Sequence, residues 1–242
     1  MMYLNERIDD LQRGGLRVIQ RADAFRFGTD AVLLADFAAP RRHDRVCDLG
    51  TGTGIIPLLL YARENTISAD AVEIQPDMAD MAARSMAMNG LNEKIRVLPG
   101  DLRSIRTLLP HARYDLVTCN PPYGKAGGTL LNPDASKRLA RHEESCAIED
   151  VACAAAWLLQ NGGRLCCVFP AARMIELSDA MRKYRMAPKR IRMVHSRVEK
   201  AAHLCLMEGM LDARPGLIIE PPLVIYDENT AYTPELRRIY GL

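Results

Sequence analysis

A glycine-rich turn constrains the fold of this chain more than any other segment. Asp48-Leu49-Gly50-Thr51-Gly52-Thr53-Gly54 lies between an apolar run of strand length, Arg45–Leu49, and a helical pattern, Ile55–Arg63. Glycine lets the backbone approach a ligand closely, and a helix N-terminus favours polar or anionic groups. The turn therefore predicts a site for a nucleoside cofactor at the end of a buried strand.

The turn lacks the glycine spacing of nicotinamide-binding folds, whose fingerprint is G-x-G-x-x-G. A frame that starts at Gly50 needs glycine where Ile55 stands. A frame that starts at Gly52 needs glycine where Pro57 stands. Because the fingerprint fails in both frames, the sequence disfavours a nicotinamide cofactor.

Strand-length apolar runs alternate with helical patterns over most of the chain. We predict strands at residues 45–49, 70–74, 95–98, 114–119 and 164–169, and helices at 55–63, 77–89, 148–159 and 171–185. The last of these helix patterns follows the fifth strand directly. This βαβα alternation is typical of an α/β fold with a doubly wound, parallel sheet.

The C-terminal part follows a different pattern. Residues 190–195 and 203–211 are predicted to be two strands joined by a short charged loop, which gives an antiparallel hairpin. Residues 217–226 are extended, and Pro221-Pro222 restricts them to a sheet edge or a loop. Residues 234–240 fit a short helix.

The composition suits one domain. The chain has 242 residues, of which 48% are hydrophobic and 26% charged. We expect a single domain over 1–242, with an N-terminal lead-in at 1–43, a core at 44–212 and a C-terminal extension at 213–242. The longest apolar run, 55–62, is too short to span a bilayer.

The cysteines and the first residues indicate a reducing compartment. The seven cysteines are an odd number and form neither a CxxC pair nor a Cys/His zinc pattern, so no metal site is predicted. Residues 1–10 lack the basic start and apolar core of a secretory signal. A cytoplasmic protein with reduced thiols fits best.

Positive charge is concentrated in one segment. Residues 182–200 hold eight arginines and lysines against Glu199 alone. One interpretation is a phosphate-facing surface, with candidate contacts at Lys183, Lys189, Arg190 and Arg192. The other is a helix end and an edge strand protected by charge.

Three acids stand where a nucleoside cofactor would need them. Asp48 precedes the glycine turn, Glu73 ends the second strand, and Asp101 follows the third in Gly100-Asp101-Leu102. An acid before the turn can face an ammonium, a carboxylate after the second strand can accept hydrogen bonds from ribose, and the third can reach an adenine amine. The alternative is that Asp48 and Asp101 only cap helices.

Asn120-Pro121-Pro122-Tyr123 ends the fourth strand and opens on the same crevice. The Asn120 side-chain carbonyl and the Pro121 backbone carbonyl can accept the two hydrogens of a planar amine and orient its lone pair. Tyr123 supplies a ring on which a planar substrate can stack. The alternative is an ordinary Asn-Pro turn.

Two features follow this segment. Residues 125–128 are glycine-rich and begin with Lys125, and they could close over a substrate. Arg141-His142-Glu143 could contact a phosphate or order that loop. An idle loop and a solvated helix entry are the alternatives.

Together these residues resemble class I S-adenosylmethionine-dependent methyltransferases that carry an N-P-P-Y motif. Such enzymes methylate adenine N6, cytosine N4 or glutamine N5. Three further segments are similar to the bacterial tRNA adenine-N6 enzymes that modify the adenine at position 37, 3′ of the valine anticodon: Phe25-Arg26-Phe27-Gly28-Thr29-Asp30-Ala31-Val32-Leu33-Leu34, Ala140-Arg141-His142-Glu143 and Tyr232-Thr233-Pro234-Glu235.

The resemblance implies a Rossmann-like, seven-stranded methyltransferase sheet, mostly parallel with an antiparallel C-terminal hairpin. It implies S-adenosylmethionine as cofactor and RNA as partner, most of all a tRNA anticodon stem-loop. The implied cofactor residues are Asp48, Gly50, Gly52, Glu73, Asp101, Leu102, Asn120, Thr29 and Asp30. Asn120, Pro121 and Tyr123 would hold the target base.

Three other functions stay open. The same amine-binding residues serve the glutamine-N5 enzymes, although only 47 residues precede Asp48, too few for their N-terminal helical domain. Ribosomal-RNA guanine-N2 enzymes more often have phenylalanine where Tyr123 stands. A non-catalytic RNA-binding member of the fold would not need an intact glycine turn.

Overall fold

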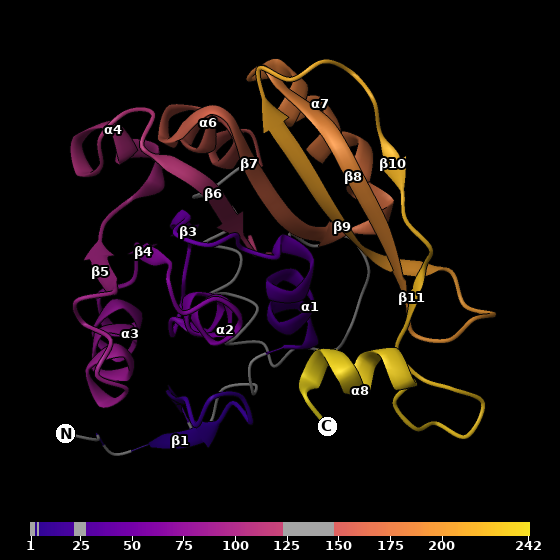
Figure 1. Ribbon diagram of the computed structural model, residues 1–242, viewed down its shortest axis with the longest axis horizontal. Helices are drawn as coiled ribbons and strands as arrows, with labels where there is room; N and C mark the ends of the chain where they lie inside the picture. The colour runs from indigo at the N-terminus through magenta and orange to yellow at the C-terminus, as the bar shows by residue number, and fades with distance from the viewer. Residues whose placement is uncertain (1–2, 4, 22–27, 123–147) are drawn as a thin grey trace.

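One central sheet with helices on both faces organises the molecule (Figure 1). The computed structural model describes residues 3, 5–21, 28–122 and 148–242. Its main elements are β3 (Arg45–Leu49), α2 (Ile55–Arg63), β4 (Ser68–Glu73), α3 (Pro76–Met88), β5 (Ile95–Pro99), α4 (Ile105–Leu108), β6 (Tyr114–Cys119), α6 (Ile148–Leu158), β7 (Leu159–Pro170), α7 (Met174–Lys183), β8 (Met186–His195) and β9 (Ala202–Leu211). The predicted α/β class is confirmed.

The two faces of the sheet bury separate apolar cores. One core is built from α1 (Thr29–Ala38), α2 and α8 (Pro234–Tyr240), with Leu33 and Leu58 fully buried. The other is built against α6 and α7, with Leu158 and Leu177 fully buried. Figure 1 shows α4, α6 and α7 on one side of the sheet and α1, α2 and α3 on the other. This is the doubly wound arrangement that the βαβα pattern predicts.

The sheet order is β10-β8-β9-β7-β6-β3-β4-β5, where β10 is Ile218–Ile219, and β11 (Leu223–Val224) also pairs with β8. The strands β3 to β7 are parallel to one another, and β9 is antiparallel to both β7 and β8. The seven long strands match the predicted seven-stranded sheet and its C-terminal hairpin.

The sheet has two short strands beyond the predicted seven. β10 (Ile218–Ile219) and β11 (Leu223–Val224) each pair in parallel with β8. Pro221 and Pro222 separate them, because proline has no N–H to donate to the ladder. The prolines therefore place this segment at the sheet edge, as the sequence predicts.

β7 begins earlier than predicted. It starts at Leu159 and runs through Asn161-Gly162-Gly163, where the sequence pattern places the loop that closes the preceding helix. Gly162 has a φ of 78°, and a Cβ at Gly163 would lie 3.0 Å from the Tyr114 carbonyl oxygen. The glycines thus serve an irregular pairing with β6 rather than a helix end.

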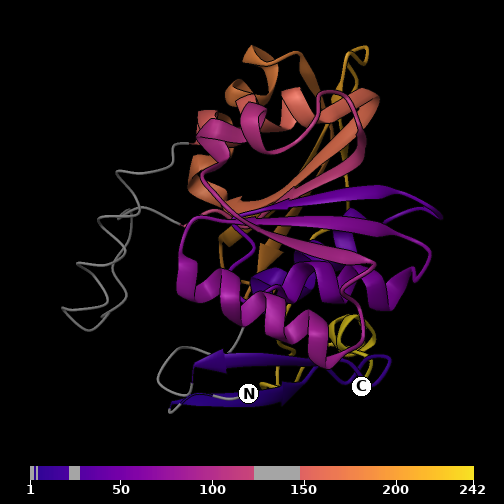
Figure 2. The same ribbon diagram turned by 90° about the vertical axis from the view of Figure 1, so that its left-hand side faces the viewer.

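The N-terminal lead-in contains a hairpin that the sequence pattern does not reveal. β1 (Glu6–Asp10) and β2 (Arg17–Arg21) pair antiparallel and pack on α3 (Figure 2). The Ile19 N–H donates to Ser85 Oγ at 3.0 Å. Asn89 accepts from the Arg17 N–H and donates to the Arg17 carbonyl. These contacts come from α3, which lies far away in the sequence.

In the described part of the chain, no helix is long and apolar enough to cross a bilayer.

A buried ion-pair network joins β7, β8, β9, the end of α1 and Asp44, the residue before β3. Arg164 on β7 contacts Asp44 at 3.3 Å and Glu208 on β9 at 3.2 Å, and all three side chains are buried. Arg190 on β8 shares the same Glu208 oxygen at 3.1 Å. Arg164 also donates to the carbonyl of Ala38 at the end of α1, where the helix dipole favours a positive charge. The network therefore ties α1 to the antiparallel strands.

We expect Glu208→Ala to lower the free energy of unfolding by about 3 kcal/mol or more, because it leaves the buried Arg164 with one acid, Asp44, in place of two. Urea unfolding followed by circular dichroism measures the change. Lys183→Ala is the matched control, since it breaks the solvent-exposed Lys183–Glu149 pair and should cost less than about 1 kcal/mol. Equal losses in the two variants would contradict a structural role for the network.

Candidate active site

The strand register brings the predicted cofactor residues to one edge of the sheet. Leu49, the last residue of β3, is opposite Val72 on β4 and Cys119 on β6. Glu73 ends β4 opposite Pro99 on β5. The glycine turn, Glu73, Asp101 and Asn120 therefore all follow strand ends at the carboxyl edge, where open α/β sheets bind ligands.

The glycine turn has a backbone that requires glycine. Gly50, Gly52 and Gly54 have φ values of 70°, 57° and 82°. At Gly54 a Cβ would also lie 2.4 Å from the Met86 methyl carbon, so glycine allows α2 to pack on α3. At Gly50 a Cβ would meet no described atom within 4 Å. The space beside Gly50 is thus open to a ligand.

Glu73 holds the turn through its carboxylate. Oε2 accepts from the Gly52 N–H at 2.8 Å, and Oε1 accepts from the Gln75 N–H at 2.9 Å. The side chain is buried at the end of β4. Each carboxylate oxygen can accept more than one hydrogen bond, so both oxygens can still receive a ribose hydroxyl.

Asp48 is a buried carboxylate with an unsatisfied oxygen. Oδ1 accepts from the Thr118 hydroxyl of β6 at 2.6 Å, so Asp48 does not cap a helix. Within the described residues, Asp48 Oδ2 and Thr51 Oγ1 are buried and form no hydrogen bond of ordinary geometry. The Thr51 hydroxyl is nevertheless near the Asp48 carboxylate and, like that of Thr118, lowers its pKa against the larger effect of burial. Burial raises the pKa of Asp48 to about 7. A ligand ammonium at Oδ2 would supply the missing partner and favour the charged form, which fits the amino group of S-adenosylmethionine.

Asp101 has a structural partner that the sequence reasoning missed. It caps the short 3₁₀ helix Leu102–Ser104 by accepting from the Arg103 N–H, as the helix-cap alternative expects, and its predicted cofactor role stays a prediction. Its carboxylate also pairs with the Arg103 guanidinium at 2.6 Å, which holds the pKa of Asp101 below its usual value. Leu102 is half-buried against the core beneath it. An adenine amine that contacts Asp101 would share its carboxylate with the Arg103 guanidinium.

Asn120 and Pro121 follow β6 directly. Asn120 is half-buried, Pro121 is buried and Pro122 is exposed. Since Cys119 is opposite Leu49, Asn120 lies next to the glycine turn. Tyr123, Lys125 and Arg141 lie outside the described residues, so their predicted roles stay predictions.

Thr29 and Asp30 begin α1. The Tyr240 hydroxyl donates to Thr29 Oγ1 at 3.2 Å, which ties the start of α1 to the C-terminal helix. Tyr240 stacks on Tyr232, which stacks on Tyr226, with ring centroids 5.5 and 5.6 Å apart. The C-terminal segment thus packs against the start of α1. The predicted cofactor role of Thr29 and Asp30 stays a prediction.

The four arginines and lysines proposed for RNA all have protein partners. Lys183 pairs with Glu149, Lys189 donates to the Arg214 carbonyl, Arg190 pairs with Glu208 and Glu220, and Arg192 pairs with Glu235. These contacts fit the alternative in which charge protects the helix end and the strand edge. Their role in binding RNA stays a prediction.

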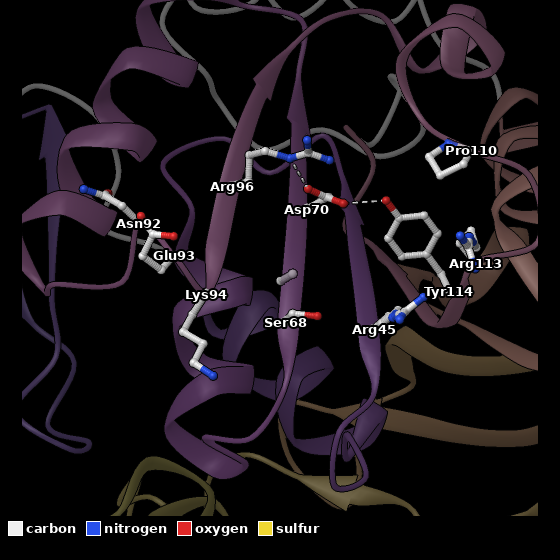
Figure 3. Close-up of a pocket in the computed structure, with 11 residues that line it drawn as sticks. Arg45, Ser68, Asp70, Asn92, Glu93, Lys94, Arg96, Pro110, Arg113 and Tyr114 are labelled. Carbon is white, nitrogen blue, oxygen red and sulfur yellow. Dashed lines mark hydrogen bonds and ion pairs between the residues drawn. The ribbon is translucent and has the colours of Figure 1, made fainter.

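A cavity of about 400 Å³ lies at the opposite edge of the sheet (Figure 3). It is lined by residues that precede or begin β3, β4, β5 and β6, among them Lys94 and Arg113. Inside it, Asp70 pairs with Arg96 at 2.7 Å and accepts from the Tyr114 hydroxyl at 2.5 Å. This cavity is remote from the strand ends that carry the glycine turn. No cluster of three or more metal-ligating side chains occurs in the described ranges.

A family model for the methyltransferase small domain matches residues 22–190, which include the glycine turn and Asn120. The chain belongs to this family. The predicted methyltransferase class is thereby confirmed, and the carboxyl edge of the sheet carries the candidate active site.

Relatives and solved structures agree with this assignment. The chain is 32% identical over 231 residues to the tRNA1(Val) (adenine(37)-N6)-methyltransferase of Porphyromonas gingivalis, covering 91% of this chain and 89% of that one. It is 34% identical to the protein of the same name from Tolumonas auensis, covering 88% and 86%. The crystal structure of a predicted O-methyltransferase from Agrobacterium tumefaciens superposes with a TM-score of 0.73 at 24% identity, covering 88% and 96%. That likeness shows the fold.

The raised pKa of Asp48 predicts how its substitution depends on pH. In the ligand-free protein the folded state holds a proton on Asp48 that the unfolded state loses above about pH 4. The contribution of this bound proton to the free energy of unfolding is therefore fully present below about pH 4 and is lost as pH rises toward about 7. Asp48→Asn should gain stability relative to wild type over this range and hold the gain above it. Thermal unfolding at several pH values tests this, and a pH-independent difference would contradict it.

Proposed function

We propose that this protein transfers a methyl group from S-adenosylmethionine to N6 of an adenine in a tRNA anticodon loop, at position 37 of a valine-type tRNA. The arrangement at the carboxyl edge carries the proposal, because a buried acid with an unsatisfied oxygen and an Asn-Pro-Pro segment follow neighbouring strands. The names of the relatives support the choice of tRNA and adenine.

The cofactor supplies the methyl group when it is bound. Asp48 would pair with its ammonium, the backbone at Gly50 would leave room for it, and Glu73 would accept from its ribose hydroxyls. Asp101 and Leu102 would border the adenine, and Thr29 and Asp30 would close the pocket from the N-terminal side. These roles follow from the order of the strand ends.

The remaining chemistry is positioning of a weak nucleophile. The exocyclic amine of adenine has its lone pair delocalised into the ring. The Asn120 side-chain carbonyl and the Pro121 backbone carbonyl would each accept one of the amine hydrogens and turn the lone pair toward the methyl group. The new N–C bond forms as the methyl–sulfur bond breaks, and the methylated nitrogen then loses a proton. An anticodon loop suits this site because its bases are already unpaired.

Asn120→Ala should lower the methylation rate by about a hundredfold or more, because it removes one of the two acceptors. The assay uses labelled S-adenosylmethionine, unmodified bulk tRNA and nucleoside mass spectrometry. Wild type should give labelled N6-methyladenosine, and the variant should largely retain cofactor affinity by calorimetry. An active Asn120→Ala variant would refute the positioning role.

The same assay separates the other candidate functions. Label in ribosomal RNA as N2-methylguanosine would identify a guanine enzyme, and label in a protein glutamine would identify a glutamine-N5 enzyme. Cofactor binding without transfer to any of these acceptors would indicate a non-catalytic member of the fold.

A further inference from the structure

The turn between β8 and β9, residues 196–201, lies at the same edge of the sheet as the candidate active site. β7 is parallel to β6 and ends at Pro170, which is opposite Leu204 on β9. Because β9 is antiparallel to β7, it begins at the carboxyl edge, and β8 ends there with His195 opposite Ala202. In Figure 1 the end of β8 lies beside β11, with which it pairs.

The start of β9 is within reach of nucleotides that flank a base held at Asn120. Two strand spacings separate β9 from β6, which is about 10 Å across the sheet. Asn120 is level with Val168, which is opposite Leu206. His203 lies three residues further toward the carboxyl edge, about 10 Å beyond that level. The start of β9 and the turn therefore lie beside the strand ends that carry the candidate active site.

His203 at the start of β9 is also close to Asp30, one of the predicted cofactor residues. The pKa of His203 is lowered by burial and, to a smaller extent, raised by the carboxylate of Asp30. Asp30 is in the first turn of α1, so the beginning of α1 and the beginning of β9 are close in space. The start of α1 and the start of β9 thus lie at the same edge of the sheet.

The turn presents a lysine to which the described residues supply no acidic partner. Lys200 is exposed, and its ammonium forms no ion pair within the described part of the chain. This distinguishes Lys200 from Lys183, Arg190 and Arg192, whose charges are compensated. Glu199 is the one acid in the turn, so the turn keeps a net positive charge.

Hydrogen bonds hold the turn in one shape. His195 Nδ1 lies 2.7 Å from the Lys200 carbonyl, and the Lys200 N–H donates to the Arg197 carbonyl. Arg197 donates to the Asp227 carbonyl and to Thr230 Oγ1, which anchors the turn on the C-terminal segment. A lysine on a fixed turn loses less freedom when it binds a ligand.

We propose that Lys200 and His203 bind backbone phosphates of the RNA nucleotides next to the methylated base. The inference rests on the proposed function and adds the surface along which the RNA lies, across the carboxyl ends of β7, β9 and β8. It moves the RNA contact from Lys183, Lys189, Arg190 and Arg192, whose side chains have protein partners, to the end of the basic segment. Lysine and histidine N–H groups are ordinary phosphate donors.

The test measures binding of unmodified tRNA to the full-length protein by fluorescence anisotropy at several salt concentrations. Lys200→Ala should weaken tRNA binding by about threefold to tenfold at low salt and reduce the salt slope by about one. Lys200→Arg should restore both, and His203→Ala should weaken binding in the same direction. Affinity for S-adenosylmethionine should be unchanged in all three variants.

Lys94→Ala is the matched control, since it removes one exposed positive charge from the opposite edge (Figure 3). It should leave the tRNA affinity and the salt slope as in wild type. If wild type methylates tRNA and Lys200→Ala and His203→Ala behave like Lys94→Ala, the phosphate contact is wrong and the proposed function stands. If wild type methylates no tRNA, both the proposed function and the contact are wrong.

Discussion

The candidate active site at the carboxyl edge of the sheet depends on the common register of β3, β4 and β6. Parallel pairing puts Leu49, Val72 and Cys119 side by side, so the segments that follow them emerge together. The Thr118–Asp48 hydrogen bond then joins β6 to β3, and the Glu73 carboxylate joins β4 to the glycine turn. A one-residue slip of β6 would turn its side chains to the opposite faces of the sheet and separate Thr118 from Asp48.

Local chemistry explains what the sequence could predict. The glycine turn, the acids at strand ends and the proline-interrupted edge depend on residue types that have few structural alternatives. The β8–β9 hairpin was predictable from two apolar runs around a charged turn. Candidate cofactor residues could be named because a doubly wound sheet brings its carboxyl ends together.

Long-range contacts explain what the sequence could not predict. Glu208 is 44 residues from Arg164, and nothing in either neighbourhood shows that they form a buried pair. The β1–β2 hairpin depends on Ser85 and Asn89 of a distant helix. The charges of Lys183, Arg190 and Arg192 looked available to a ligand because their acidic partners lie elsewhere in the chain, on α6, on β9 and in the segments that follow β9.

The broken edge strand has a consequence for the behaviour of the protein at high concentration. β10 exposes Ile218 and Ile219, whose exposed fractions are 63% and 74%. A long apolar strand in this position would be a template for edge-to-edge aggregation between molecules. The pairing of β10 stops after two residues because Pro221 and Pro222 follow, so a second molecule finds no continuous ladder to extend. The prolines thus protect the sheet from growing beyond its own chain.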